Sequence, residues 1–130
     1  MRAFKTKIFA RISRRSKIPD EVLRDSASRA ESGQIDATLG KFLIKQRVER
    51  PNEGRSGGFR AIVVFKAGDI TVFVHMFPKN AQGNLSPEAL EVFRELAKHF
   101  ANLGEDEIER LVAAKEWIEI EDDETQEKLP

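Results

Sequence analysis

The fold is decided by residues 59–77, whose sequence is FRAIVVFKAGDITVFVHMF. Two runs of apolar and β-branched residues, 59–65 and 70–77, favour β-strands. The connection between them, 66–69, has the length and the glycine of a hairpin turn. The preceding residues 42–49 alternate in character with a period of two, which predicts a further strand. The sequence therefore predicts an antiparallel meander of three strands at the centre of the chain.

Helices are predicted before and after this meander. Before it, apolar residues at helical spacing predict helices near 7–15 and 19–32, and a proline followed by two acids suits the start of the second. After it, a serine followed by a proline predicts the start of a helix over 87–103, and a fourth helix is expected over 105–115. Helices before and after an antiparallel sheet of three or four strands indicate an α+β fold, with the helices packed on the sheet.

The composition fits one folded domain followed by an acidic tail. The chain has 130 residues, 40% of them hydrophobic, which is the size of a single domain. We predict this domain over 1–117 and a tail over 118–130, whose polar and acidic composition favours disorder. The absence of cysteine excludes disulfides and cysteine metal sites. No apolar run reaches the roughly 20 residues of a membrane helix, so we expect a cytoplasmic protein without membrane contact.

The charge is unevenly distributed, although the formal net charge is zero. Residues 1–79 carry 17 Lys and Arg against 8 Asp and Glu, a net charge of +9, whereas residues 80–130 carry 5 against 14, a net charge of −9. Such asymmetry suggests a basic part that contacts a polyanion, joined to an acidic part. The alternative is that the charges belong to solvated surfaces, and for the acidic half this alternative is the favoured one.

Basic residues are concentrated around the glycine-rich turn between the strands predicted at 42–49 and 59–65. Lys45 and Arg47 lie two apart and so share one face of their strand, while Arg55 and Arg60 flank the glycines. If the two strands pair as a hairpin, these cations converge, and arginine matches phosphate oxygens with two parallel hydrogen bonds. The alternative is a charged sheet edge that prevents aggregation, and spacing alone does not separate these two interpretations.

An ordered series of motifs resembles the RelE/ParE superfamily of type II toxins, and most closely the HigB-like RelE toxins. The series consists of KTKIFAR at 5–11, IKQR at 44–47, GRSGGFR at 54–60 and FPKN at 77–80. The resemblance extends from residue 1 to about 115. It implies a compact α+β fold and a toxin that cleaves mRNA on the ribosome without a metal ion. It also implies a cognate antitoxin as partner, which we expect to be a helix-turn-helix protein.

The resemblance also suggests roles for individual residues. Lys45 and Arg47 match the family's basic pair before the turn, and Arg60 matches its arginine after the turn. Lys79 lies in the basic element after the last strand. We expect Lys45 to take the proton of the attacking 2′-hydroxyl and Arg60 to stabilise the phosphorane. Arg47 and Lys79 would hold the phosphate. Three further residues are expected to contact RNA: Arg50, Arg55 and Asn80.

The chain departs from the most familiar RelE pattern after the last strand. That pattern has an arginine and a tyrosine there, whereas the matching positions fall near Asn80 and Ser86 and the chain contains no tyrosine. His75 is a candidate proton donor, although a histidine inside an apolar strand is more often a core residue. Two isolated histidines offer no metal-ligand spacing, and the glycine-rich turn lacks the order of a nucleotide-binding loop. We therefore expect neither a metal nor a small-molecule cofactor.

Three functions are consistent with these residues. The first is a ribosome-dependent mRNA endonuclease, whose partners are mRNA, the ribosome and the antitoxin. The second is a ParE-like toxin that inhibits DNA gyrase through protein contacts, and the third is a catalytically weakened module that binds antitoxin or RNA. The basic cluster favours the first, because a gyrase inhibitor has no use for a phosphate-reactive cluster. A separate hypothesis is that the acidic segment 119–127 shields the chain's own basic surface.

Overall fold

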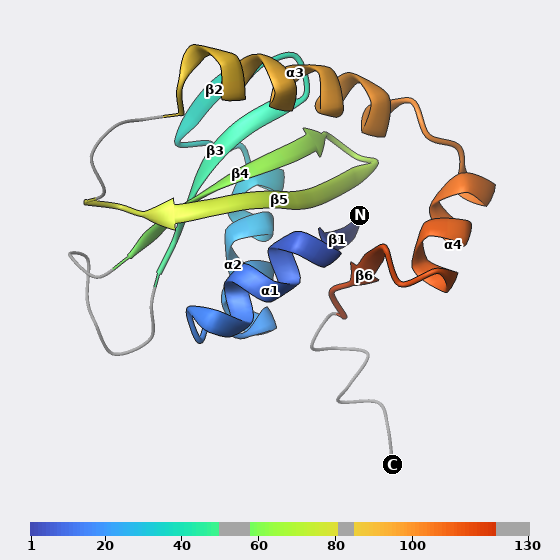
Figure 1. The fold of residues 1–130 in the computed structure, drawn as a ribbon, viewed down its shortest axis with the longest axis horizontal. Coiled ribbons are helices and arrows are strands. Elements are labelled where there is room, and N and C mark those ends of the chain that lie inside the picture. Colours follow the sequence, from blue (N-terminus) through green and yellow to red (C-terminus); the bar gives the residue numbers. More distant parts are fainter. Residues whose placement is uncertain (50–57, 81–84, 122–130) are drawn as a thin grey trace.

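The computed structural model describes residues 1–49, 58–80 and 85–121. These residues form a six-stranded sheet in the order β2-β3-β4-β5-β1-β6, with helices on both sides (Figure 1). The strands are β1 (Arg2–Thr6), β2 (Ala37–Gly40), β3 (Leu43–Val48), β4 (Phe59–Lys66), β5 (Ile70–Pro78) and β6 (Trp117–Glu119). The helices are α1 (Lys7–Arg15), α2 (Asp20–Glu31), α3 (Pro87–Ala101) and α4 (Glu105–Ala113). The predicted α+β class is confirmed.

The predicted meander is present, because β3, β4 and β5 pair antiparallel in chain order. At the hairpin between β4 and β5, Gly68 has a φ of +76°, a conformation that glycine adopts without steric cost. The prediction of a purely antiparallel sheet with three or four strands is wrong. β1 pairs parallel with β5, β6 adds antiparallel to β1, and β2 extends the opposite edge. A strand of three to five residues shows no clear period of two, so β1, β2 and β6 cannot be recognised from their local pattern.

The four helices occur where the sequence predicts them, with ends that differ by at most two residues. Side-chain caps explain this agreement at the starts of α1 and α3. The hydroxyl of Thr6 accepts a hydrogen bond from the backbone N–H of Phe9, and that of Ser86 accepts one from Ala89, each at 3.1 Å. Such caps satisfy backbone donors that a helix start leaves free, so they determine the helix start from neighbouring residues alone.

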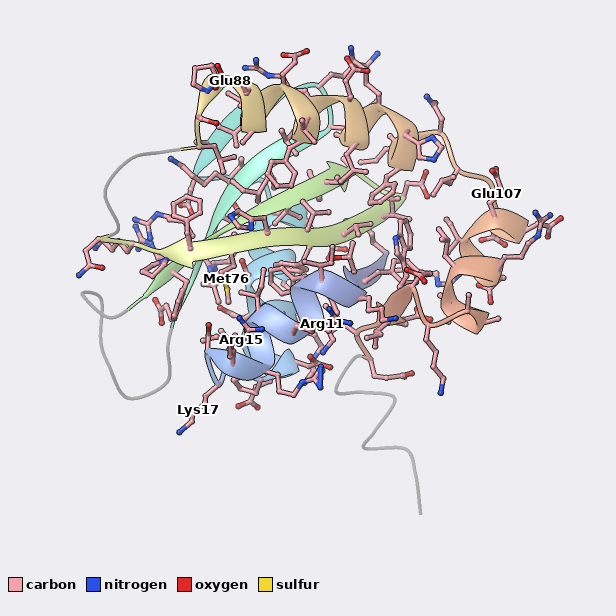
Figure 2. All side chains as sticks on the ribbon, in the orientation of Figure 1. Arg11, Arg15, Lys17, Met76, Glu88 and Glu107 are labelled. Carbon is pink, nitrogen blue, oxygen red and sulfur yellow. The ribbon has the colours of Figure 1, made fainter. Side chains whose placement is uncertain are left out.

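The sheet separates two apolar cores. On one side, α1 and α2 pack Phe9 and Leu23 against Met76 and other residues of the sheet (Figure 2). On the other side, α3 and α4 cover a core that includes Leu43 and Trp117. Successive residues of a strand point to opposite faces, and β1, β3, β4 and β5 each contribute to both cores. A functional residue on a strand is therefore assigned to the α1 side or to the α3 side by its register.

The C-terminal part is attached through β6. The backbone N–H of Ile120 donates to the carbonyl of Ala3 at 2.8 Å, and its side chain is buried. Arg2 forms ion pairs with Glu119 and Glu109, both at 2.8 Å. These hydrogen bonds, first to Glu119 and then to Glu109, raise the pKa of Arg2 above its ordinary value. Arg2 thereby ties α4 and β6 to β1.

The division into a domain over 1–117 and a tail over 118–130 remains a prediction. β6 spans the proposed boundary, and residues 122–130 lie outside the described residues. Within the described ranges, no helix has both the length and the hydrophobicity to span a membrane.

Candidate functional site

Arg47, Arg60 and Phe77 form a row across three neighbouring strands, which we call the outer row. Arg60 of β4 lies opposite Arg47 of β3 and also opposite Phe77 of β5. Residues directly opposite each other point to the same face of a sheet. Phe77 packs against the core beneath α3, so the outer row lies on the α3 side.

Arg47 and Arg60 are placed as close as two residues of neighbouring strands can be. The backbone N–H and C=O of Arg47 bond away from β4, to Asp36 and to side chains of α2. The pair is therefore of the non-hydrogen-bonded kind, in which the Cα atoms are about 4.5 Å apart and the side chains are closest. Like charges in directly opposite positions destabilise a sheet. The fold thus maintains a repulsive pair.

No carboxylate in the described part of the chain neutralises these cations. We call Lys45, Arg47 and Arg60 the strand cluster. All three are partly buried, and none forms an ion pair with a described residue. The Nε of Arg47 is buried and has no hydrogen-bond partner among the described residues. A buried donor without a partner costs about 1–3 kcal/mol, so this atom offers an unused hydrogen bond to an anion.

Lys45 belongs to a second row, the inner row, with Ile62 and His75. Ile62 separates the other two, since it pairs with Lys45 on one side and His75 on the other. The half-buried ring of His75 stacks on Phe93 of α3, with centroids 5.6 Å apart and planes inclined by 21°. Burial lowers the pKa of His75, which favours the neutral ring. His75 is thus close to the basic residues but is packed as a core aromatic.

Phe77 brings an aromatic surface to the cations, a role that its sequence pattern does not predict. It is partly exposed, lies opposite Arg60, and has its ring centroid 6.1 Å from that of His75. A phenylalanine in an apolar strand is normally expected in the core. The only sequence signal is its position at the end of the strand, at the start of the FPKN motif. The register with Arg60 is what assigns it to the site.

Gln46 holds β3 from the opposite face. It is 1% exposed, and its amide nitrogen donates to the carbonyls of Ser26 at 3.2 Å and Gln34 at 3.1 Å. Its amide oxygen accepts from the backbone N–H of Asp36 at 2.9 Å. This one side chain therefore connects α2, the loop after α2 and β3. The sequence signal for this role is that Gln46 is a polar residue in an otherwise apolar series with Ile44 and Val48.

Further contacts hold the backbone of Arg47 itself. Its carbonyl accepts hydrogen bonds from the hydroxyl of Ser26 at 2.9 Å and from the guanidinium of Arg29 at 2.6 Å. Its N–H donates to the carboxylate of Asp36. Every backbone polar group of Arg47 is thus occupied by a side chain, because β2 does not extend this far along β3. These bonds fix the backbone of β3 at the point where the repulsive pair occurs.

The remaining predicted residues lie towards the same end of the sheet or outside the described residues. The backbone N–H of Lys79 donates to the carbonyl of Gly58 at 2.9 Å, which continues the ladder between β4 and β5. Lys79 and Asn80 are exposed. Their backbone therefore follows the outer row directly. Arg50 and Arg55 lie outside the described residues.

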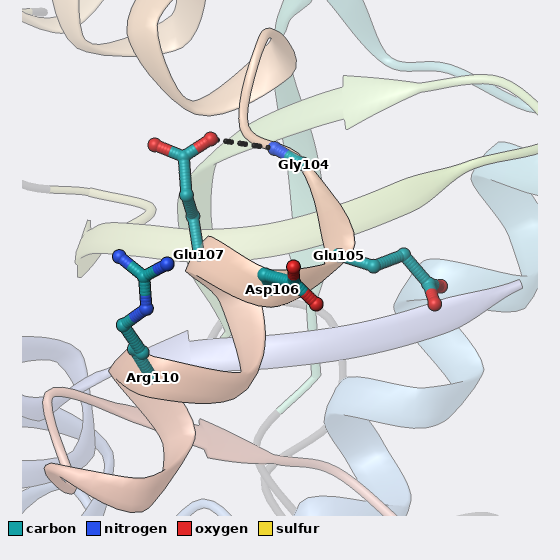
Figure 3. A pocket seen from close by; sticks show the side chains of 5 residues that line it. All are labelled: Gly104, Glu105, Asp106, Glu107 and Arg110. Atoms are coloured by element: carbon teal, nitrogen blue, oxygen red, sulfur yellow. Dashed lines mark hydrogen bonds between the residues drawn. The ribbon is translucent and has the colours of Figure 1, made fainter.

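A shallow depression of about 520 Å³ lies elsewhere, at the N-terminus of α4 (Figure 3). One carboxylate oxygen of Glu107 is already used there, because it accepts from the N–H of Gly104 at 3.0 Å. Within the described residues, no group of three or more His, Cys, Asp or Glu side chains is arranged to hold a metal ion. An acidic lining disfavours phosphate, so this depression is not part of the site. Its lining residues are Gly104, Glu105, Asp106, Glu107 and Arg110.

Comparison with known proteins provides an independent observation. A family model described as "RelE toxin of RelE / RelB toxin-antitoxin system" matches residues 1–120. The match spans every helix and strand of the described residues. A search among curated proteins found no match.

Proposed function

The chain belongs to the RelE toxin family and is thus a toxin of a toxin-antitoxin system, and we propose that it acts as a ribosome-dependent mRNA endonuclease of the HigB-like type. The observation that carries this proposal is the pairing of Arg47 with Arg60, neither of which forms an ion pair with a described residue. Such a pair is unfavourable in the free protein and becomes favourable when an anion lies between the two guanidinium groups. A phosphodiester of RNA is an anion of this kind.

The proposed reaction is a transesterification within the RNA. The 2′-oxygen of one nucleotide attacks the neighbouring phosphorus, and the bond from phosphorus to the 5′-oxygen breaks. A 2′,3′-cyclic phosphate and a 5′-hydroxyl are formed. The reaction needs a base for the 2′-hydroxyl proton, cations for the charge on the phosphorane, and a proton for the leaving 5′-oxygen. All bonds change within the RNA, so the protein supplies only proton transfer and charge.

Each of these tasks has a candidate in the two rows. We assign the base to Lys45, the phosphorane contact to Arg60, and the positioning of the phosphate to Arg47 and Lys79. The leaving oxygen takes its proton from solvent, because the outer end of the site is open at the exposed Lys79. His75 is the weaker proton donor, since its lowered pKa favours the neutral ring and its stacking fixes it in the core.

Phe77 is proposed to stack on a nucleobase of the bound RNA. Proteins that bind single-stranded RNA combine cations along the backbone with aromatic rings on which bases stack. The outer row has this composition, because the partly exposed Phe77 is directly beside Arg60. The chain has no tyrosine, so the ring that stacks has to come from another residue type. This arrangement favours single-stranded RNA over a duplex, whose bases are already stacked.

The test is to incubate the purified chain with ribosomes engaged on a defined mRNA and to map the new 5′ ends. We expect cuts in mRNA on the ribosome and little cutting of free mRNA. Arg110→Ala, at an exposed arginine of α4, is the matched control and is expected to cut like the wild type. Full activity of Arg60→Ala would contradict the proposal.

The two alternative functions predict different outcomes in cells that express the chain. A gyrase inhibitor would induce the DNA-damage response and leave mRNA intact. A catalytically weakened module would bind RNA or antitoxin and leave both mRNA and DNA intact. Family membership implies an antitoxin, and we propose that it is a helix-turn-helix protein encoded next to the toxin. Co-purification of such a protein with the tagged chain tests this part of the proposal separately.

A further inference from the structure

The outer surface of α1 carries cations that the proposed function does not use. Lys7, Arg11, Arg14 and Arg15 are all exposed, and we call them the α1 stripe. At 3.6 residues per turn they fall within an arc of about 100° on the helix, opposite the buried Phe9. Two of them, Arg11 and Arg15, are labelled on α1 in Figure 2. The stripe therefore lies on the other side of the sheet from the strand cluster.

The helix gains from these charges only in its last turn, where the dipole favours Arg14 and Arg15. α1 contains no acidic residue, and no member of the stripe forms an ion pair within the described ranges. Lys7 is followed four residues later by Arg11, and Arg11 four residues later by Arg15, and like charges at this spacing destabilise a helix. Lys7 also lies in the first turn, where the helix dipole disfavours a cation. These costs indicate that the stripe serves an anionic partner.

The acidic end of the chain leaves the fold next to α1. The backbone N–H of Lys7 donates to the carbonyl of Glu116 at 2.9 Å, so the start of α1 lies beside the segment that leads into β6. Arg24 of α2 donates to the carbonyl of Glu121, the last described residue. The sequence EDDETQE over 121–127 contains five acids and no base. A run of acids thus begins on the side of the sheet that α1 and α2 cover, where Ile120 is buried in their core.

We propose that residues 122–127 bind the α1 stripe and act as an intramolecular counter-charge for it. Nine residues follow Glu121, and an extended chain of that length reaches about 30 Å. The nine-residue helix α1 is only about 13.5 Å long, so the tail is long enough to cover the stripe. A tethered segment has an effective concentration in the millimolar range, so a weak attraction between exposed charges suffices. The contact is independent of the reaction proposed for the strand cluster.

The contact has a defined consequence for other anions. A polyanion that approaches α1 has to displace the tail, so the tail weakens non-specific binding of nucleic acid to this side of the molecule. Because the charges are exposed, the effect is strong at low ionic strength and disappears at high salt, where screening removes attraction beyond a few ångström. The strand cluster has another location and is not covered by this contact.

The first test compares the full chain with a variant whose tail is neutralised, D122N/D123N/E124Q/E127Q. In nuclear magnetic resonance spectra at low salt, we expect backbone amide shifts to differ within residues 7–15 and to agree elsewhere in the fold. The difference is expected to disappear at high salt. Identical shifts of α1 in the two proteins at low salt would overturn the proposal. The variant keeps the chain length and every core residue, so folding is not at issue.

The second test measures affinity for oligodeoxythymidine, a polyanion that lacks the 2′-hydroxyl and cannot be cleaved by the proposed reaction. At low salt, the neutralised tail is expected to raise this affinity several-fold. Addition of R11Q and R15Q is expected to remove the gain, whereas R110Q on α4, the matched control, is expected to leave it. Equal affinities of the wild type and of the variant with the neutralised tail would reject the tail contact. Loss of mRNA cleavage is not a readout here, so failure of this proposal and failure of the proposed function are distinguishable.

Discussion

Two cationic regions of this molecule, the strand cluster and the α1 stripe, consist of the same residue types but are assembled differently. The strand cluster combines Lys45 and Arg47 of β3 with Arg60 of β4, and its members are partly buried. The α1 stripe comes from one helix of nine residues, and its members are exposed. Water screens the charges of the stripe from one another, whereas strand pairing holds Arg47 against Arg60.

This difference separates two uses of positive charge. A cation that is held rigidly and partly desolvated interacts strongly with an anion at one position, which is what stabilisation of a transition state requires. A cation in water attracts any anion weakly over about a Debye length. The network around Gln46 and the backbone of Arg47 fixes β3 at the strand cluster.

The largest effect is expected from a substitution that disrupts the strand cluster. Arg60→Leu is expected to slow cleavage of mRNA on the ribosome by about 10²–10³-fold, because one preorganised charge is lost from the transition state. The same variant removes a like-charge pair, so its free energy of unfolding is not expected to fall. Rates of cleavage and urea unfolding curves measure both effects. Arg11→Leu in the α1 stripe is the comparison, and a loss of similar size there would show that the two regions are not distinct.

A second change tests the aromatic member of the outer row. Phe77→Leu retains an apolar side chain but removes the flat ring, and it is expected to weaken binding of single-stranded RNA by about 1–3 kcal/mol. Phe77→Trp is the matched control and is expected to retain affinity. The measurement is titration of a fluorescent RNA that carries 2′-O-methyl groups and is not cleaved. The dependence of affinity on salt is expected to stay unchanged, because no cation is altered; a changed salt slope would assign the effect to displaced arginines.

The network below the strand cluster provides the third prediction. Gln46→Leu removes the partners of the buried carbonyl of Ser26, of the partly buried carbonyl of Gln34 and of one backbone N–H, and it is expected to lower the free energy of unfolding by about 1–3 kcal/mol. Urea unfolding measures this loss. Gln34→Leu is the control, because the network uses only the backbone carbonyl of Gln34 and its side chain is exposed. Equal losses in the two variants would mean that the buried amide of Gln46 has no special role.

The smallest expected effect concerns pH. Burial lowers the pKa of His75 below its ordinary value of 6.5, so the unfolded chain takes up the proton first as the pH falls. The free energy of unfolding is therefore expected to decrease as the pH falls below 6.5. His75→Phe retains the stacking with Phe93 and is expected to make unfolding in urea less dependent on pH between 7.5 and 5. The exposed His99→Gln is the control, and an unchanged pH dependence in His75→Phe would contradict this assignment.

Much of the local structure was predictable because its causes are local. The hydroxyls of Thr6 and Ser86 cap their helices from the adjacent residues, and Gly68 allows the turn between β4 and β5. The period of two in β3 placed Lys45 and Arg47 on one face, and the ordered motifs identified the family. In these cases a few neighbouring residues contain all the information that the conformation needs.

The sequence by itself thus determined the helices, the meander, the family and the basic residues around the glycine-rich turn. Only the tertiary structure decided that β1 pairs with β5, that Arg60 lies between Arg47 and Phe77, and that Gln46 joins α2 to β3. The partner of Arg2 across β1 and β5 is Ile70, which lies far away along the chain. Pairing at such distances depends on which registers bury both faces of the sheet together, and this is a property of the whole chain that no local pattern contains.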